Sequence, residues 1–189
     1  MRGRARPEHG GRGLDPERPG PGRVVLPDVA GGRADALRAA QAQVVTPALE
    51  RLVEANTLLS GLGFESSGLA AAHAVHNGLT AAPGTHAYFH GEKVAYGLLV
   101  QLVLEGQPRS VLEEVLYFAT EVGLPVTLAE VGLAELPGEL LQRVAARATA
   151  QGETIHNEPF EVRPDMVADA LRAADAVGRA WKKHEGLTA

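Results

Sequence analysis

The sequence predicts an all-α fold, a helical bundle preceded by a disordered N-terminal arm. From Ala34 onward, apolar residues recur at the spacing of a helix face. No stretch alternates apolar and polar residues over enough positions to predict a strand. The first 33 residues differ sharply in composition from the rest. We therefore expect two units, a disordered arm at residues 1–33 and a helical domain at residues 34–189.

The arm is rich in arginine, glycine and proline. Residues 1–33 contain seven arginines, four acidic residues, eight glycines and five prolines, so they carry a net charge of +3 and the remainder carries −8. Such a composition buries too little apolar surface to offset the entropy lost on ordering. The acidic residues interrupt the basic ones, which disfavours a nucleic-acid or membrane tail. The arm also lacks the apolar core of a secretory signal.

Helix starts and stops divide the second unit. Each piece is bounded by a capping residue, a proline or a glycine. Residues 78–84, which contain Pro83, are expected to form a loop, and either Ser66 or Ser67 is expected to cap the helix before it. The predicted helical pieces are 34–45, 46–59, 66–77, 90–106, 108–122, a short turn at 127–132, 137–150 and a last helix from 164 that ends near Lys183.

Composition excludes several classes of protein. The chain has 189 residues, enough for one ordinary domain, and no cysteine, so any metal must be held by imidazole, carboxylate or water. No apolar run approaches the roughly 20 residues of a transmembrane helix. The net charge of −5 gives no electrostatic case for nucleic acid or an anionic membrane. We expect a soluble, cytoplasmic protein with no nucleic-acid or membrane partner.

Histidines carry the first chemical signal. Five of the seven fall between Ala72 and His156, and four of those lie within eighteen residues. His73 and His76 stand three apart, on one face of a predicted helix, and His90 opens the next helix. Imidazoles from adjacent antiparallel helices can bind a metal, or can bind a substrate hydroxyl and move its proton. A partly solvated surface without chemistry is the competing interpretation.

The spacing matches no known zinc signature. No HExxH motif occurs, and a catalytic zinc normally takes three protein ligands. The nearby carboxylates are Glu65, which precedes the helix, and Glu92, which lies where an acidic residue is an ordinary cap. Spacing alone therefore leaves the metal and surface interpretations open.

Several blocks in the right order identify a resemblance. These blocks are VVTPALERLVEANTLLSGLGFESSGLAAAHAVHNGLT at 44–80, HGEKVAYGLLVQLVLE at 90–105, GLPVTLAEVG at 123–132 and GETIHN at 152–157. They resemble the C-terminal helical domain of glycerol dehydrogenase, in the iron-containing (group III) alcohol dehydrogenase superfamily. The resemblance runs from about Ala39 to Lys182 and implies the helical domain shared with dehydroquinate synthase.

The resemblance implies a metal site in a cleft. In that family an N-terminal α/β domain binds NAD and the helical domain holds one divalent metal, which is zinc in the glycerol enzymes. The implied ligands here are His73 and His90, and His76 is implied to lie beside the metal or to face the substrate. Zinc would polarise a hydroxyl of glycerol or a similar small polyol while hydride passes to NAD. No catalytic residue beyond the metal ligands, and no cofactor-binding residue, is implied.

The sequence also departs from its family. It has no Gly-rich phosphate loop between a strand and a helix, and no room for a nucleotide domain. The family's third metal ligand is an aspartate. None of the aspartates of this chain lies in a matching sequence context; they are Asp15, Asp28, Asp35, Asp165, Asp169 and Asp175. We therefore expect this polypeptide alone to be unable to oxidise glycerol.

Two interpretations of the chain follow. It is either the metal-binding part of a glycerol dehydrogenase, catalytic only with a nucleotide domain, or a non-catalytic helical remnant that acts at most as an oligomerisation module, with homo-oligomers as its assemblies. The composition of the arm favours a truncated gene or a frame read out of register in GC-rich DNA. His156 is left with two interpretations, a chemical role or a buried polar position.

Overall fold

The computed structural model describes residues 32–59, 61, 65 and 68–187, and these residues form seven α-helices and no strand. The predicted all-α fold is therefore confirmed. Most of the predicted arm, residues 1–31, lies outside the described residues. In order, the helices are α2 (Arg33–Gln41), α3 (Pro47–Glu54), α5 (Ala71–Leu79), α6 (His90–Leu104), α7 (Arg109–Val122), α8 (Gly138–Ala148) and α9 (Pro164–His184).

Four short helical pieces join these helices. A π-helical turn, η1 (Ala55–Leu59), continues α3, and three single 3₁₀ turns follow later in the chain. The 3₁₀ turns are η2 (Pro83–Thr85), η3 (Ala129–Val131) and η4 (Thr154–Asn157). No helix among the described residues is long and apolar enough to cross a membrane.

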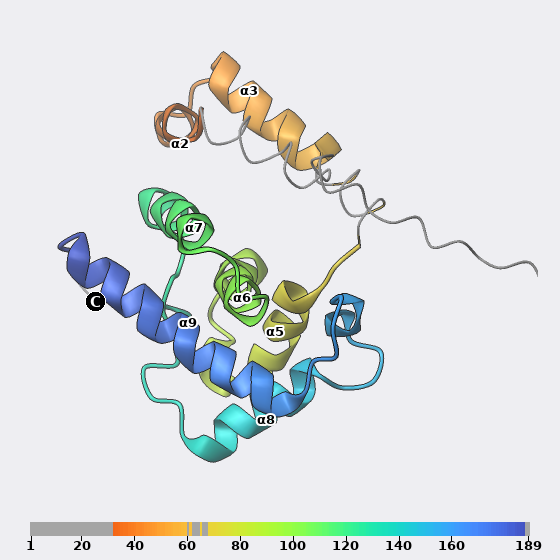
Figure 1. The fold of residues 1–189 in the computed structure, drawn as a ribbon. Helices are drawn as coiled ribbons and strands as arrows, with labels where there is room; N and C mark the ends of the chain where they lie inside the picture. Colours follow the sequence, from red (N-terminus) through yellow and green to blue (C-terminus); the bar gives the residue numbers. More distant parts are fainter. Residues whose placement is uncertain (1–31, 60, 62–64, 66–67, 188–189) are drawn as a thin grey trace, which may run out of the picture.

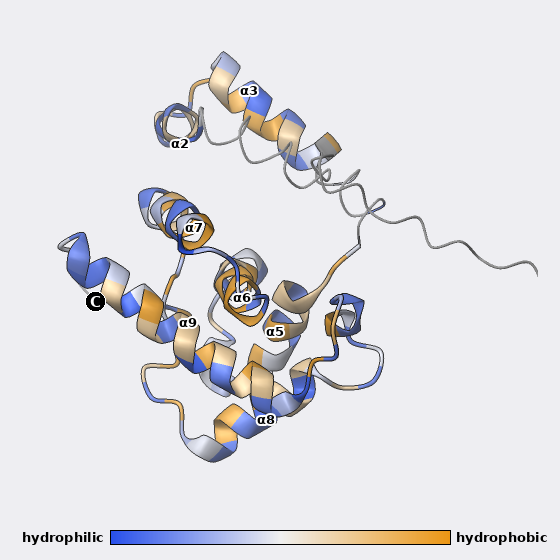
Figure 2. Ribbon diagram, viewed as in Figure 1, coloured by the Kyte–Doolittle hydropathy of each residue, from blue (hydrophilic) through white to orange (hydrophobic). Residues whose placement is uncertain are grey.

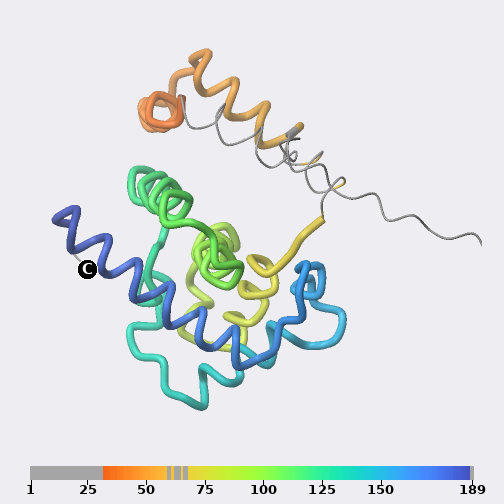
Figure 3. The backbone as a smooth tube through the Cα atoms, in the orientation of Figure 1, coloured from red at the N-terminus to blue at the C-terminus, as the bar shows by residue number. Residues whose placement is uncertain are grey.

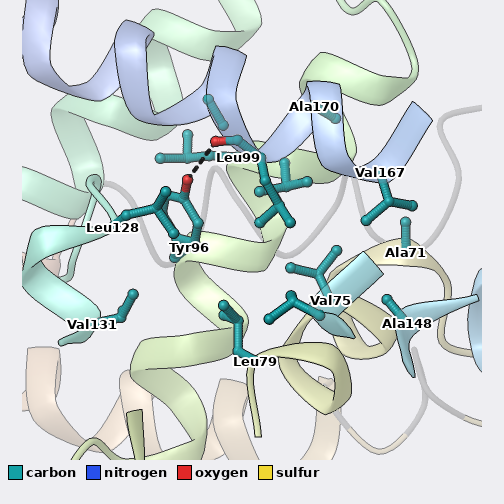
Figure 4. Close-up of a cluster of buried hydrophobic side chains, with 14 of the residues drawn as sticks. Ala71, Val75, Leu79, Tyr96, Leu99, Leu128, Val131, Ala148, Val167 and Ala170 are labelled. Atoms are coloured by element: carbon teal, nitrogen blue, oxygen red, sulfur yellow. Dashed lines mark hydrogen bonds between the residues drawn. The ribbon is translucent and has the colours of Figure 1, made fainter. Parts of the chain in front are cut away.

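Helices α5 to α9 form one body, and α2 and α3 lie beside it (Figure 1). Helix α6 contacts α5, α7 and α9, and α8 packs on α5 and α9. Tyr96 of α6 is fully buried at the centre, where its hydroxyl donates a hydrogen bond to the Leu171 carbonyl of α9 at 2.9 Å (Figure 4). The main apolar cluster draws only on residues from Ala71 onward. The body around α6 therefore has its own core.

Helices α2 and α3 form a hairpin that packs less extensively than the helices of the body. Helix α2 contacts α7, but α3 makes its main contacts with α2 and η1 and buries none of its own residues. Both hydrophobic and hydrophilic residues lie along α3 (Figure 2), and Val53 is 53% exposed. The predicted start of α3 is confirmed, because the Thr46 hydroxyl accepts a hydrogen bond from the Leu49 N–H at 3.3 Å and Pro47 opens the helix.

The structure places the start of α2 one residue earlier than the sequence predicts. Helix α2 begins at Arg33, the last residue assigned to the arm, and ends at Gln41 rather than at Val45. The guanidinium of Arg33 pairs with Glu121 of α7 and lies 5.2 Å from the ring centroid of Phe118. Arg33 therefore connects the α2–α3 hairpin to the body.

The predicted start of α5 is wrong. Residues 68–70 are not helical and lead into α5 as an extended segment (Figure 3), and the helix begins at Ala71. Ser66 and Ser67, the predicted caps, lie outside the described residues. Helix α5 also continues through Gly78 to Leu79, into the stretch expected to be loop. Side chains distant in sequence hold its first turn, and a local pattern does not reveal such partners.

The remaining predictions place the elements well. Helix α6 begins at His90, Pro108 precedes α7, Gly123 ends α7 with a φ of 77°, and Pro137 precedes α8. Helix α9 begins at Pro164. Basic residues occupy its last turn, as expected against the helix dipole: Lys182, Lys183 and His184.

Candidate metal centre

Helices α5 and α6 approach each other backbone to backbone. A Cβ atom on Gly97 of α6 would lie 2.3 Å from the carbonyl oxygen of Ala72 on α5, which is far inside van der Waals contact. Only glycine allows this approach. Because His73 follows Ala72 directly, the contact brings the histidine face of α5 close to α6.

Three imidazoles meet where these helices pack. The ring centroids of His73 and His90 are 5.5 Å apart, and those of His76 and His90 are 4.2 Å apart. His90 Nδ1 lies 3.1 Å from His76 Nε2, within hydrogen-bond distance. His73 and His76 are half-buried and His90 is exposed. The structure thus brings together all three histidines that the sequence singled out.

The environment favours the neutral form of the two histidines on α5. Burial lowers the pKa of His73, and the neighbouring His90 lowers it further. Burial also lowers the pKa of His76, and the hydrogen bond with Asn77 offsets only part of this effect. Neutral imidazole is the form that ligates a metal, so these pKa shifts suit a metal centre.

The chemistry of the donors fits part of a zinc site. Zinc is bound by neutral imidazole nitrogens, and catalytic zinc takes three protein ligands with an open position. The described part of the chain contains no group of three His, Asp or Glu side chains placed to share one metal ion. The histidine cluster therefore supplies imidazole donors without a complete ligand set of its own.

The nearby carboxylates have other positions. The Glu92 carboxylate accepts a hydrogen bond from the Phe89 N–H at 2.6 Å and so caps α6, as the sequence predicts. Glu65 is exposed. Within the described residues, neither carboxylate is placed to share a metal ion with the histidine cluster, so neither supplies a third metal ligand there.

The two other central histidines lie apart from the cluster. His86 is exposed, and its Nε2 atom lies 3.0 Å from the Thr80 carbonyl oxygen at the end of α5. His156 is also exposed, with its Nε2 atom 3.2 Å from the Ala150 carbonyl oxygen. Of the two interpretations of His156, the buried polar position is therefore wrong.

The segment around η4 anchors the first turn of α5. The Glu158 carboxylate accepts a hydrogen bond from the Ala71 N–H at 2.9 Å, and the Thr154 hydroxyl donates to the Ala70 carbonyl at 2.8 Å. Burial and the neighbouring Glu105 raise the pKa of Glu158. On the α6 side, the Gln101 side chain accepts from the Ala72 N–H at 2.9 Å. These contacts fix the turn that precedes His73.

A second set of contacts links His76, through Asn77, to residues on and after α8. The Asn77 amide donates to the Glu153 carboxylate at 2.7 Å, and the Asn77 amide oxygen lies 3.0 Å from His76 Nδ1. Arg147 pairs with Glu153. Burial raises the pKa of Glu153, but the hydrogen bonds from Asn77 and Arg147 outweigh it and leave the pKa below its ordinary value. Sequence reasoning missed Asn77 and Glu153, although they lie inside the blocks at 44–80 and 152–157 that carry the family resemblance.

The cluster lies away from the groove between α7 and α9. That groove has a volume of about 560 Å³ and is lined mostly by apolar side chains, including Leu112, Leu116, Val177 and Trp181. None of the three clustered histidines lines it. In this chain the imidazoles instead lie at the α5–α6 junction, where His73 and His76 are half-buried and His90 is exposed.

Fold and site together define a class: an all-helical unit that presents three imidazoles from two antiparallel helices. The chain is homologous to the C-terminal helical segment of glycerol dehydrogenases. It is 58% identical over 147 residues to glycerol dehydrogenase of Thermotoga maritima, a match that covers 78% of this chain and 40% of the relative. It is 57% identical over 143 residues to the Citrobacter freundii glycerol dehydrogenase, covering 76% of this chain and 39% of that protein.

The fold agrees with this homology. The crystal structure of glycerol dehydrogenase from Schizosaccharomyces pombe superposes with a TM-score of 0.82 and 41% sequence identity, covering 88% of this chain and 44% of that one. The chain thus spans about 40% of the length of the curated relatives it matches. A scan against models of known protein families gave no match.

Proposed function

We propose that this chain supplies the metal-binding helical part of a glycerol dehydrogenase, with His73 and His90 as ligands of Zn²⁺. The observation that carries the proposal is the meeting of His73, His76 and His90 at the α5–α6 junction, within a region that is 58% identical to a glycerol dehydrogenase. The complete reaction is the oxidation of glycerol, or a similar small polyol, by hydride transfer to NAD. A nucleotide-binding domain and a further metal ligand must complete the site.

The residues of this chain bind and orient in that reaction. Zn²⁺, when bound, supplies the Lewis acidity that lowers the pKa of a substrate hydroxyl. His73 and His90 hold their nitrogens at a fixed separation because α5 and α6 touch through Gly97 and Ala72. His76 lies between His90 and Asn77, where it can orient His90. A polyol and a second domain would approach from the exposed side of His90.

Zinc titration tests the metal part of the proposal. Isothermal calorimetry on the 189-residue chain should show one zinc bound per chain, weakly because the ligand set is incomplete. His73→Ala and His90→Ala should each abolish the binding, whereas His86→Ala, which alters an exposed histidine outside the cluster, should leave it unchanged. Zinc binding that survives both cluster variants would overturn the assignment.

A second assay tests the need for another domain. With glycerol, NAD and zinc, the 189-residue chain alone should form no NADH. Adding a fragment of a homologous glycerol dehydrogenase that carries both its nucleotide-binding domain and its aspartate metal ligand should give NADH that depends on His73 and His90. Zinc-dependent NADH formation by the chain alone would contradict the proposal.

Self-association is the second candidate function, and the α3 surface favours it. Helix α3 buries none of its own residues, and three apolar side chains on and next to it are exposed by half or more: Val45, Val53 and Leu58. A non-catalytic helical module could pair through such a face. Light scattering distinguishes the candidates, because Val53→Lys with Leu58→Lys should dissociate a dimer of this kind and leave zinc binding intact.

A further inference from the structure

We infer that Glu153, Asn77 and His76 form a directed hydrogen-bond chain that fixes the tautomer of His90, so that His90 Nε2 carries the lone pair offered to a metal. This assigns Glu153, Asn77 and His76 as positioning residues. The inference rests on the proposed function only in treating His90 as a metal ligand. The hydrogen-bond chain itself is a property of the metal-free protein.

Glu153 sets the direction of the chain. The Glu153 side chain is only 9% exposed, and its carboxylate is held by Arg147 and, when ionised, can only accept hydrogen bonds. The Asn77 atom 2.7 Å from this carboxylate must therefore be the amide nitrogen, because an amide oxygen there would face another acceptor. The orientation of the Asn77 amide thus follows from the chemistry of its partner.

The Asn77 amide then sets the tautomer of His76. With its nitrogen on Glu153, the amide presents its oxygen to His76 Nδ1 at 3.0 Å. An amide oxygen only accepts, so His76 Nδ1 must carry the proton. In a neutral imidazole the other nitrogen is then unprotonated, and His76 Nε2 becomes an acceptor.

His76 passes the direction on to His90. His90 Nδ1 lies 3.1 Å from His76 Nε2, and a hydrogen bond between them needs one donor and one acceptor. Because His76 Nε2 accepts, His90 Nδ1 donates, and neutral His90 keeps its lone pair on Nε2. Metal-ligating histidines commonly donate their other ring N–H to a fixed acceptor, which orients the ring and selects the tautomer.

Close helix packing makes this chain of contacts possible. A Cβ atom on Gly78 of α5 would lie 2.5 Å from the Val144 carbonyl oxygen of α8, so the two helices touch one residue after Asn77. Arg147 lies on α8 and Glu153 follows that helix. The contact between α5 and α8 therefore places the Glu153 carboxylate within hydrogen-bond distance of Asn77, next to His76 on α5.

Nitrogen-15 NMR of the metal-free protein tests the inference directly. Long-range proton–nitrogen spectra, recorded at a pH where the imidazoles are neutral, report which ring nitrogen carries the proton. We expect His76 and His90 both to be protonated on Nδ1. Asn77→Leu, which removes both amide contacts at similar volume, should release both rings to mixed tautomers. Asn56→Leu, which alters an exposed asparagine on η1, should change neither.

Zinc affinity provides a second readout that a purely structural role would not move. Asn77→Leu should weaken zinc binding by about 10- to 100-fold, the usual effect of losing a residue that orients a ligand, with an unchanged helical circular dichroism spectrum. Glu153→Gln keeps the volume but lets the Asn77 amide reverse, so it should give mixed tautomers and an intermediate affinity.

The two readouts separate the inference from the proposed function. A wild-type His90 protonated on Nε2, or tautomers unchanged by Asn77→Leu, would overturn the inference even if zinc binds. The expected tautomers in a protein that binds no zinc would support the hydrogen-bond chain and contradict the metal-binding function instead.

Discussion

Glu130 shows at the scale of one residue how a carboxylate joins distant parts of this fold. Its carboxylate accepts hydrogen bonds from the N–H groups of Val126 and Thr127 at 2.9 and 3.0 Å, and it also pairs with Lys182 of α9. Burial raises the pKa of Glu130, but these hydrogen bonds outweigh burial and leave the pKa below its ordinary value. The charged form is thus favoured in the folded state.

This shift predicts a stability change in acid. Because the folded pKa of Glu130 is lowered, its stabilisation is complete above about pH 4.3, the ordinary glutamate value, and is lost as the pH falls through the folded pKa. Glu130→Gln should lower the free energy of unfolding at pH 7 by about 1–3 kcal/mol and flatten the acid loss. Urea unfolding at several pH values measures both. Glu114→Gln, at an exposed site on α7, is the control, and an equal effect there would contradict the prediction.

A second prediction concerns Gly97, where α6 touches the backbone of α5. Gly97→Ala places a Cβ against the Ala72 carbonyl and must push α5 away from α6, so it should destabilise the protein by about 1–3 kcal/mol and weaken zinc binding. Gly91→Ala lies on the same helix with no atom within 4 Å of the new Cβ. It should leave stability unchanged or raise it by up to ~1 kcal/mol. Thermal melting compares the two, and equal melting temperatures would show that the contact tolerates a methyl group.

The sequence revealed the histidines but not the residues that orient them. His73, His76 and His90 were predicted because their number and spacing are unusual over a short stretch of chain. Glu153 and Glu158 contact α5 across 76 and 87 residues. Such contacts follow from tertiary packing, and no local periodicity encodes them.

At the scale of elements, helix α3 is the least supported. Its main partners among the described residues are α2 and η1, and it buries none of its own residues. A helix with few buried apolar contacts opens locally at low free energy. We therefore expect α3 amides to exchange with deuterium faster than those of α6, measured by mass spectrometry. Protection of α3 equal to that of α6 would mean that its apolar face is covered in solution.

Replacing Arg33, with Arg38 as the control, tests how the α2–α3 hairpin is attached to the body. Because it pairs with Glu121 and lies against Phe118, Arg33→Ala should speed exchange in α2 and leave α6 unchanged. Arg38→Ala removes an exposed arginine that pairs with Asp35 on the same helix, and it should have little effect. Equal exchange of α2 in both variants would assign no special role to the contact with α7.

Helix starts were predictable where the signal is local. Thr46-Pro47 and Pro164 open helices as expected, because a hydroxyl cap or a proline acts within its own turn. The start of α5 was missed, because its first N–H groups are taken by Glu158 and Gln101 instead of a neighbouring serine. Glu158 and Gln101 lie far from α5 in the sequence, so no local sequence pattern identifies them as its caps.

At the scale of the whole molecule, the core belongs to the second part of the chain. The apolar cluster runs from Ala71 to Ala174 and includes nothing from α2 or α3. A fragment of residues 68–189 should therefore fold cooperatively, with a melting temperature lower by no more than about 4 °C, equivalent to ~1 kcal/mol. Circular dichroism melting tests this. A broad, uncooperative transition would show that α2 and α3 are needed for the core.

The contacts between η4 and the first turn of α5 affect when the site can form during synthesis. The residues that hold Leu69, Ala70 and Ala71 follow them by 84 to 88 positions. On the ribosome, α5 and α6 emerge well before this anchor is translated, so the histidines are made early but oriented late. Contacts of such sequence separation form slowly, because a long loop must close first. Metal acquisition should accordingly follow the emergence of η4 from the ribosome.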